Sequence, residues 1–342
     1  MQFLSYNNVQ CCNENVHKGR GELMLNNYNY FIVLAEEENI SRAAERLFIS
    51  HQCLSKYLKN LEQEYRVTFF ERTPRLKLNV AGQAMLDMCR KVQFLEQNLE
   101  NQLEDVRQSK RGLIRLGTTE GRYRILFPDL LAQFKQMYPD VTLQVSYATS
   151  EQLTERLLKN ELDVVLMNRS FVDHTQLNIV PLLEERLFLV ISDAMLEKYL
   201  PDQYPECLET FARDGADLSQ LQEVPFILNK KTFNSRIMLD TYLNAHGWHL
   251  NCVMELTQLD LHFMMSARDY AASFCWSMYL PTIRDMNRLD PEHALNVFPI
   301  RGLDERNHMV LVTQKDKILP EFGKSLIDLI RRSCRKFENM TV

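Results

Sequence analysis

A long stretch without proline limits what this chain can fold into. Asn79 is of a residue type that caps helix N-termini, and beyond Gly82 no proline or glycine follows until Gly112. Apolar side chains recur in this stretch at alternating steps of three and four, the spacing of a coiled-coil seam. They are Met85, Met88, Val92, Leu95 and Leu99, with Leu103 and Val106 following after a slip in phase. The spacing predicts one long linker helix over residues 80–110.

The rest of this helix is polar, so it has only one narrow apolar stripe to bury. Packing of the stripe on the helix's own domain is one interpretation. We favour self-pairing through Met85, Met88, Val92, Leu95 and Leu99, which predicts a homodimer. Further assembly of such dimers to a tetramer stays open beside the dimer alone.

Length and composition set the protein class. A chain of 342 residues exceeds one compact domain, and 45% hydrophobic with 25% charged residues is typical of globular proteins. The sequence has no GxGxxG, GxxxxGK[ST] or GxSxG motif, so the commonest phosphate loops and nucleophile elbows have no local signature. The net charge of −5 means that any nucleic-acid surface must gather its cations locally.

The cysteines and the hydropathy pattern indicate the compartment. The eight cysteines are dispersed without a CxxC pair, which favours reduced thiols. No apolar run is long enough to cross a bilayer and no secretory signal opens the chain, so we expect a cytoplasmic protein without a membrane partner. Residues 1–23 are polar and Asn-rich. They predict a disordered extension, and the chain starts either at Met1 or, beyond this segment, at Met24.

Residues 24–79 have the pattern of a small helical domain. Apolar spacing predicts a helix from Asn27 to about Glu38, a second helix with Ser41 as its cap, a turn at Phe48-Ile49 and a third helix capped by Ser50. Two short helices joined in this way predict a helix-turn-helix, which projects its second helix into a DNA major groove. The outward positions of that helix are His51, Gln52, Ser55, Lys56 and Lys59.

A hairpin follows, with its tip at Arg72, Thr73, Pro74 and Arg75. Six lysines and arginines against three glutamates lie between His51 and Asn79, a local excess of positive charge that suits phosphate contacts. A solvated helix face with a charged turn is the alternative. The helix spacing, the capping residues and the hairpin together favour DNA binding.

The sequence from Tyr28 to Leu86 resembles the winged helix-turn-helix of LysR-type transcriptional regulators. The similarity rests on SRAAERL, the Leu54-Ser55 pair, FFER and the Ala81-Gly82 step. The resemblance implies that the long helix is the dimerisation helix. Base contacts are implied for His51, Gln52, Ser55 and Lys56, and backbone contacts for Ser41, Arg42, Lys59, Thr73 and Arg75, while Arg72 joins them as a residue of the hairpin tip. His51-Gln52 replaces the usual Gln-Pro and Tyr65-Arg66 the common Leu-Gly, so the preferred base sequence does not carry over.

The remaining residues alternate between strand and helix patterns. Strands are predicted at 113–118, 141–147 and 163–167 with helices between them, and a similar order recurs from 226 to 276. Residues 186–192 and 308–313 are predicted to be strands that pass between the halves, and 319–336 to be a final helix. The prediction is a two-lobed α/β domain like periplasmic binding proteins over 111–342, with 111–186 and 281–320 in one lobe and 187–280 in the other.

Residues 113–167 resemble the LysR-type effector domain, notably in LFPDLLAQFKQMYPDVTLQV and LTERLLKNELDVVLM. The chain departs from the family at Ala148 and at Arg268-Asp269-Tyr270, where glycines are usual. Ligand identity therefore cannot be inferred from relatives.

Ligands of open α/β sheets bind beyond the carboxyl ends of strands, near helix N-termini. This rule predicts an effector site at those strand ends that binds a small molecule, and the grouped hydroxyls favour an organic anion. Simple helix capping is the alternative for each hydroxyl. The predicted residues are Thr118, Thr119, Thr149, Ser150, Asn168, Arg169, Asn229, Thr232, Phe233 and Thr257.

We expect no metal, cofactor or catalytic set. His246 and His249 are suitably spaced for zinc, but Gly247 should end the helix between them and no cysteine or carboxylate pair accompanies them. The chain is thus predicted to be an effector-responsive, sequence-specific DNA-binding regulator and not an enzyme. A cytoplasmic solute-binding or enzymatic α/β protein with a helical appendage is the alternative.

Overall fold

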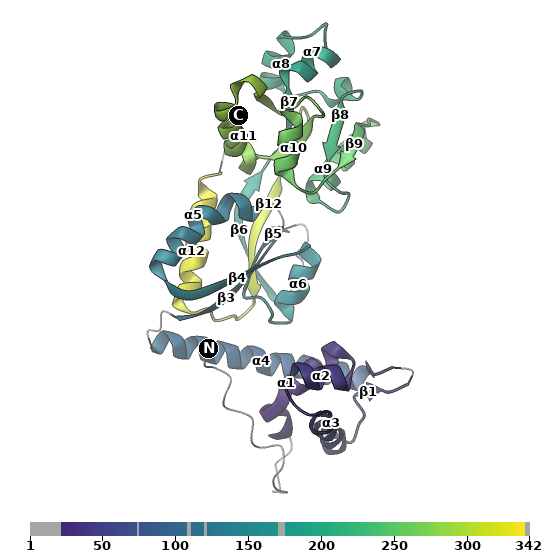
Figure 1. Cartoon of the computed structure of the whole chain (residues 1–342), viewed down its shortest axis with the longest axis vertical. Helices are drawn as coiled ribbons and strands as arrows, with labels where there is room; N and C mark the ends of the chain where they lie inside the picture. The colour runs from purple at the N-terminus through teal and green to yellow at the C-terminus, as the bar shows by residue number, and fades with distance from the viewer. Residues whose placement is uncertain (1–21, 74, 108–110, 120–121, 170–174, 339–342) are drawn as a thin grey trace. The chain divides into compact units, whose positions relative to one another are not determined.

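The computed structural model describes residues 22–73, 75–107, 111–119, 122–169 and 175–338, which group into two compact units that part after Arg107 (Figure 1). The extension predicted for residues 1–23 falls on residues 1–21 outside this description. Glu22 and Leu23 already belong to the first helix, so the prediction was wrong for these two residues.

The first unit consists of helices and a short hairpin. Ser50 and Asn79 cap helices as predicted, because their side chains accept hydrogen bonds from the backbone N–H groups of Cys53 and Gly82. Ser41 does not cap; Asn39 takes that role, since its backbone is extended and its side chain accepts from the Arg42 N–H at 3.0 Å. The elements are α1 (Glu22–Glu37), α2 (Ile40–Arg46), α3 (His51–Tyr65), β1 (Phe70–Glu71), β2 (Lys77–Leu78) and α4 (Val80–Val106).

The core of this unit fixes the position of α3. Phe31, Leu54 and Leu61 are fully buried, and the Phe31 ring meets Phe69 edge to face at a centroid distance of 5.5 Å. Gly82 lets α4 pass close to the hairpin, because a Cβ there would lie 2.1 Å from the Phe69 carbonyl oxygen. The helix, the hairpin and α4 therefore pack as one body.

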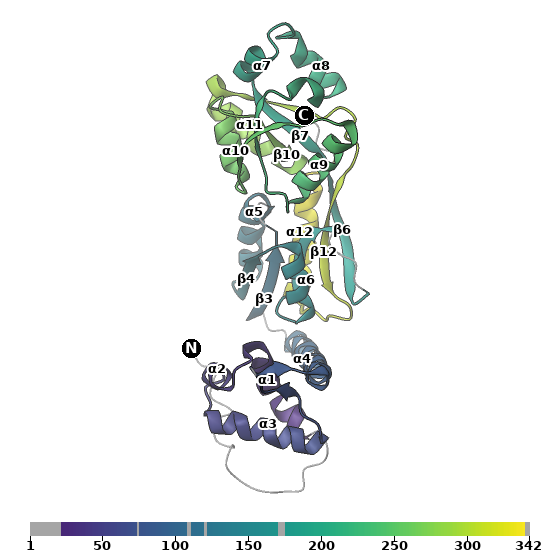
Figure 2. The ribbon, with the colours of Figure 1, turned by 90° about the vertical axis from the view of Figure 1, so that its right-hand side faces the viewer.

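The second unit has two lobes, and the first is built on a five-stranded sheet in the order β4-β3-β5-β12-β6 (Figure 2). The three strands β3, β4 and β5 are parallel, whereas β12 is antiparallel to β5 and β6. Helices α5 and α12 cover one face and α6 the other. The bounds are β3 (Arg111–Thr118), α5 (Arg122–Met137), β4 (Asp140–Tyr147), α6 (Ser150–Leu158), β5 (Val164–Asn168), β6 (Leu177–Glu185), β12 (Asn307–Gln314) and α12 (Glu321–Arg335).

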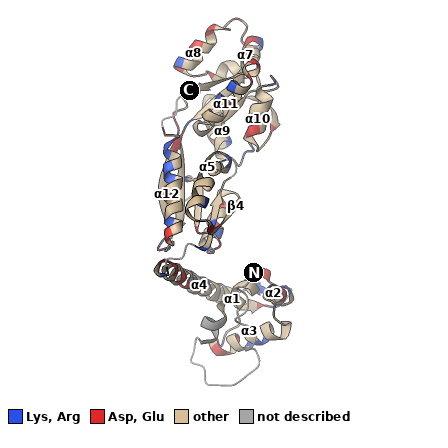
Figure 3. Ribbon diagram, turned by 60° about the vertical axis from the view of Figure 1, so that its left-hand side comes forward, with Lys and Arg blue, Asp and Glu red and all other residues tan. Residues whose placement is uncertain are grey.

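The cover helix α12 is strongly amphipathic. Phe322, Leu326 and Ile330 are buried against the sheet. Its first turn carries an acidic residue and its last turn basic ones, as the helix dipole favours (Figure 3).

The second lobe has β7 at the centre of an antiparallel sheet ordered β10-β7-β11, beside a parallel β8–β9 pair. Phe226 of β8 bridges to Ala272, just ahead of β10, so both sheets share one core. The elements are β7 (Leu187–Ser192), α7 (Asp193–Tyr199), α8 (Glu206–Asp214), β8 (Pro225–Leu228), α9 (Asn234–His246), β9 (Asn251–Glu255), α10 (Leu259–Ser266), β10 (Ser273–Trp276), α11 (Leu280–Leu289) and β11 (Leu295–Pro299), with 3-10 turns at Leu218–Leu221, Ser277–Tyr279 and Pro291–His293.

The connections between the lobes differ from the prediction. β7 and β12 each stay within one sheet, and the crossings are Arg186, between β6 and β7, and residues 300–306, between β11 and β12. β11 pairs with β7, so residues up to about 300 belong to the second lobe and not, as expected for 281–320, to the first. This antiparallel pairing joins segments far apart in the chain, which a local pattern cannot indicate.

None of the described helices is long and apolar enough to span a membrane. The described cysteines, such as the buried Cys89 and Cys275, form no disulfide with one another.

Candidate DNA-binding surface and effector site

Helix α3 presents a polar face to solvent and an apolar face to the core. His51, Gln52, Lys56 and Lys59 are exposed and Ser55 is half-buried. Leu54, Tyr57, Leu58 and Leu61 are buried on the opposite face. The polar side chains predicted to contact DNA therefore lie on the free surface of a helix whose position the core fixes.

The hairpin is held to the end of α3 by Glu62. One carboxylate oxygen of Glu62 accepts from the Phe69 N–H at 3.0 Å, and the other lies 3.1 Å from the Arg72 guanidinium. Glu62 is mostly buried while Arg72 is exposed, so Arg72 has a partner within the unit. Thr73 and Arg75 are exposed beyond this contact. The hairpin tip is thereby positioned beside α3.

The cations of this surface fall into two groups. Arg42 pairs with Glu37 at 3.4 Å and Arg72 with Glu62. Lys56, Lys59 and Arg75 form no ion pair with any residue that the structure describes. The exposed residue Ser41 precedes Arg42 in the first turn of α2. The group without a carboxylate partner can meet phosphates without first breaking an ion pair.

The sequence analysis did not single out Phe48, in the turn between α2 and α3. Its side chain is 85% exposed, and its backbone has a φ of 56°, a left-handed conformation that is uncommon outside glycine. This exposed apolar ring comes three residues before His51, the first residue of α3. No local signal distinguishes it from a packed turn residue.

The predicted seam of α4 divides into two parts. Met85 is buried and Val92 half-buried in the core of the first unit. Met88, Leu95 and Leu99 are 48%, 65% and 55% exposed. The Tyr28 hydroxyl donates to the Glu96 carboxylate, which fastens α1 to α4. The apolar stripe that remains exposed in the single chain thus consists of Met88, Leu95 and Leu99.

The predicted effector residues of the first lobe converge at one edge of the sheet. Thr118 lies opposite Tyr147 of β4 and Leu166 of β5, so the three parallel strands end together. Thr119, Thr149 with Ser150, and Asn168 with Arg169 follow those ends. Thr118 and Ser150 are buried, and Thr119 and Asn168 are half-buried.

Thr149 serves as a helix cap. Its hydroxyl accepts from the Gln152 N–H, and the Gln152 side chain accepts from the Thr149 N–H, both at 3.3 Å. The capping interpretation therefore holds for this hydroxyl. The Oδ1 atom of Asn168 is buried and has no hydrogen-bond partner among the described residues, so it can accept from a ligand.

The predicted residues of the second lobe lie around the N-terminus of α9. Asn229 directly follows β8 and donates from Nδ2 to the Ser235 hydroxyl at 2.8 Å. Thr232 is exposed, Phe233 is the N-cap residue of α9, and Thr257 follows β9. Asn229 Oδ1 and His262 Nδ1 are buried without a partner among the described residues, and both residues line a cavity of about 10 Å³. A single small hydrogen-bond donor fits a space of that size.

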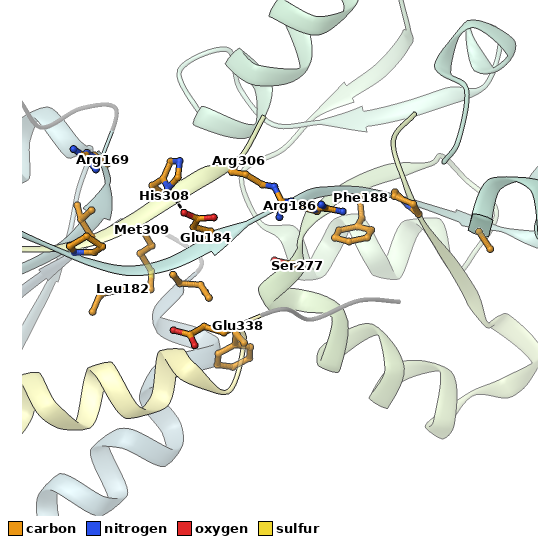
Figure 4. A pocket seen from close by; sticks show the side chains of 16 residues that line it. Arg169, Leu182, Glu184, Arg186, Phe188, Ser277, Arg306, His308, Met309 and Glu338 are labelled. Carbon is orange, nitrogen blue, oxygen red and sulfur yellow. Dashed lines mark ion pairs between the residues drawn. The ribbon is translucent and has the colours of Figure 1, made fainter. Parts of the chain in front are cut away.

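A larger pocket of about 780 Å³ lies elsewhere, at the crossing between the lobes (Figure 4). Of the predicted effector residues, only Arg169 is among the described residues that line it. Arg186, Arg306 and His308 also line it, and the sequence analysis did not identify them. They come together only through the pairing of β6 with β12.

The two histidines considered for zinc lie at the end of α9 and just beyond it. Gly247 has a φ of 68° and ends α9, as predicted. The His246 ring packs on Trp248 at 4.6 Å and its Nδ1 faces the Tyr242 carbonyl at 2.8 Å. Within the described ranges no group of three His, Cys, Asp or Glu residues is arranged to hold a metal ion.

A winged helix-turn-helix with a free recognition helix, joined to a two-lobed α/β domain, defines a DNA-binding regulator with a sensory domain. Residues 25–83 match the family described as bacterial regulatory helix-turn-helix protein, lysR family, and residues 107–335 match the LysR substrate binding domain. The chain belongs to the LysR family of transcriptional regulators.

Curated relatives agree with this assignment. The chain is 24% identical over 308 residues to the HTH-type transcriptional activator CmpR of Synechocystis, covering 90% of this chain and 94% of that one. It is 26% identical over 220 residues to the HTH-type transcriptional regulator CysL of Bacillus subtilis, covering 64% and 68%. The protein is therefore a DNA-binding regulator with an effector-binding domain, and not an enzyme.

Solved structures show the same fold. A full-length OxyR variant from Pseudomonas aeruginosa aligns with a TM-score of 0.63 at 20% identity, covering 94% of this chain and 96% of that one. Full-length CbnR in complex with its target DNA aligns with a TM-score of 0.51 at 19% identity, covering 90% and 99%. The predicted architecture is confirmed.

Proposed function

We propose that α3 enters the major groove and contacts base edges through His51, Gln52, Ser55 and Lys56. The exposed polar face of α3 carries this proposal, because each of these residue types can bond to bases. Phosphate contacts come from the residues that flank that face: Ser41, Arg42, Lys59, Arg72, Thr73 and Arg75. The complex of CbnR with its target DNA supports the same mode of binding here.

The test is a gel shift with the DNA upstream of the protein's own gene. Gln52→Ala should weaken specific binding by about 1–3 kcal/mol and relax the base preference at one position. Lys59→Ala should weaken binding to all sequences alike and make the salt dependence less steep. Gln63→Ala, an exposed residue on the same helix, serves as the matched control. Unchanged affinity and base preference in Gln52→Ala and Ser55→Ala would contradict the proposal.

We also propose that the protein acts as a homodimer through the exposed part of α4, and that dimers assemble to a tetramer. Met88, Leu95 and Leu99 otherwise expose an apolar stripe along one helix. Two-fold pairing places two recognition helices one or more DNA turns apart, so the operator should be an interrupted palindrome. The DNA partner also supports a cytoplasmic location.

The effector is proposed to be a small organic anion bound at the strand ends of the lobes. The N–H groups at the N-termini of α6 and α9 favour negative charge, and Ser150 and Thr118 add hydroxyls. The buried amide oxygens of Asn168 and Asn229 favour an anion that also carries hydrogen-bond donors.

Screening organic acids by thermal shift should identify a ligand for this site. Thr149→Ala should cost about 1 kcal/mol of stability, because the capping box is lost. Ser150→Ala should reduce effector affinity while the DNA affinity of the free protein stays unchanged. A ligand that binds Ser150→Ala and Thr118→Ala as tightly as the wild type would contradict this location.

A further inference from the structure

The residue that follows α3 has a strained backbone. Arg66 has a φ of 58° and a ψ of 34°, the left-handed conformation, and its N–H donates to the Glu62 carbonyl at the end of the helix. This conformation crowds the Cβ atom of every residue except glycine, so glycine is the usual residue at such a helix end. An arginine at this position therefore lowers the stability of the unit relative to glycine.

The left-handed residues other than glycine differ between the two units. Those described in the effector-binding unit are of the two types that tolerate this conformation best: Asn160, Asp269 and Asp316. Those described in the first unit are of types that do not: Glu38, Phe48 and Arg66. The side chains of this second group are all exposed, so packing within the unit does not offset the strain. Strain of this kind points to a role in contact with a partner.

The guanidinium group of Arg66 is free for such a contact. Arg66 is exposed, and it forms no ion pair or side-chain hydrogen bond with any residue that the structure describes. Glu62, one turn earlier, is already engaged by the Phe69 N–H and the Arg72 guanidinium. The cation can therefore bind an anion without first breaking an ion pair.

Arg66 extends the exposed polar side of α3. It lies seven residues after Lys59, which is about two helical turns or roughly 10 Å along the axis. The 15 residues of α3 make a helix about 22 Å long, whereas the major groove is about 12 Å wide. A helix that inserts its N-terminal turns into the groove cannot keep its other end inside. That end lies beside the phosphates at the edge of the groove.

We propose that Arg66 binds a DNA phosphate, a contact that a chain with glycine at this position lacks. The inference rests on the proposed entry of α3 into the major groove. The strained backbone lowers the stability of the free protein, and the added cation strengthens its binding to DNA. Since a phosphate contact does not read bases, Arg66 strengthens binding to all sequences alike.

Replacing Arg66 by glycine in the full chain tests the proposal, because the two expected effects have opposite signs. Arg66→Gly should raise the melting temperature of the DNA-binding unit by a few degrees, because the strain is relieved. It should also lower the affinity for DNA from upstream of the protein's own gene, and for an unrelated duplex, by the same factor of about three to ten. The slope of log affinity against log salt should become less steep by about 0.9 for each DNA-bound copy. Differential scanning calorimetry and fluorescence anisotropy over a series of salt concentrations measure these effects.

Two variants serve as controls. Glu38 is an exposed residue of the same unit with a φ of 46° and the opposite charge, so Glu38→Gly matches the relief of strain. It should raise the melting temperature without lowering the affinity for DNA. Arg66→Lys keeps the charge and should keep the salt dependence of the wild type.

An unchanged affinity and salt dependence in Arg66→Gly would overturn the proposal. A loss of affinity that accompanies a lowered melting temperature, or that is confined to one DNA sequence, would overturn it as well. Gln52→Ala and Lys59→Ala separate this failure from that of the proposed function. If they weaken binding and Arg66→Gly does not, α3 enters the groove without a contact from Arg66.

Discussion

Asp163 is a buried charge that joins three segments of the first lobe. Its carboxylate accepts from the Arg115 guanidinium at 2.9 Å and lies 3.0 Å from the Lys317 ammonium group, whose side chain is 1% exposed. Burial raises the pKa of Asp163, but hydrogen bonds from Arg115 and the charges of Lys317 and Arg115 outweigh it, so the pKa lies below its ordinary value. The start of β5 is thus tied to β3 and to the chain just before α12.

Replacing Asp163 should show how much its ion pairs contribute to the free energy of unfolding at each pH. Because the folded-state pKa is lowered, the stabilisation is complete above the ordinary value of ~3.9 and is lost as the pH falls through the folded pKa. Asp163→Asn leaves Lys317 buried without its carboxylate, so the free energy of unfolding should fall by about 3–5 kcal/mol at neutral pH. Urea denaturation should show that the difference from wild type narrows below about pH 4.

Asp140→Asn is the matched control, because the pair of Asp140 with Arg111 is exposed and should contribute at most about 1 kcal/mol. The assignment of buried ion pairs to Asp163 would be contradicted if Asp163→Asn lost the same free energy of unfolding at pH 3 and pH 7. It would also be contradicted if this loss were no greater than in the control.

Among the helices and strands, the exposed part of α4 gives the sharpest test of dimerisation. Val92 lies partly in the core of its own unit, so substituting it would confuse folding with pairing. Leu95→Asp with Leu99→Asp places two charges on the exposed stripe and should yield monomers with strongly reduced operator affinity. Sedimentation velocity and gel shift measure the two effects. Gln102→Asp adds a charge elsewhere on α4 and should remain dimeric; a Leu95/Leu99 variant that also remains dimeric would refute this seam.

The sequence predicted those helices whose capping residues and apolar spacing are visible in the local sequence. Ser50 and Asn79 located two helix starts, and the apolar spacing of α3 located its free face. β6 was missed because Pro181 and the pair Glu184-Glu185 are unusual in strands and because buried and exposed residues do not alternate along it. The pocket arginines were missed because Arg186 and Arg306 meet only through the β6–β12 register. What the sequence could not indicate was pairing between distant segments.

At the scale of the whole effector-binding unit, an ion pair between described residues links the two lobes. Arg124 of α5, in the first lobe, pairs with Asp260 of α10, in the second, and both side chains are about half exposed. A double-mutant cycle with Arg124→Gln and Asp260→Asn should give a coupling energy of about 0.2–1 kcal/mol, which decreases as salt is added. The Arg288–Asp285 pair within α11 is the control for a pair that does not join lobes. A coupling energy of zero, or one that does not change with salt concentration, would contradict an ion pair between the lobes.

The β6–β12 ladder also determines how such a domain can be recombined. Glu185 and Asn307 are opposite one another in that ladder, and the entire second lobe lies between them in the chain. Seen from the first lobe, residues 186–306 are therefore one large insertion in the loop of a β-hairpin, in the place where two turn residues would suffice. A gene can exchange this insertion for another while the strand order, the covering helices and the junction with the DNA-binding unit stay unchanged. The effector contacts proposed in the second lobe, such as Asn229, can thus be exchanged at two adjacent points of the backbone, whereas those proposed at Thr118, Ser150 and Asn168 stay with the first lobe.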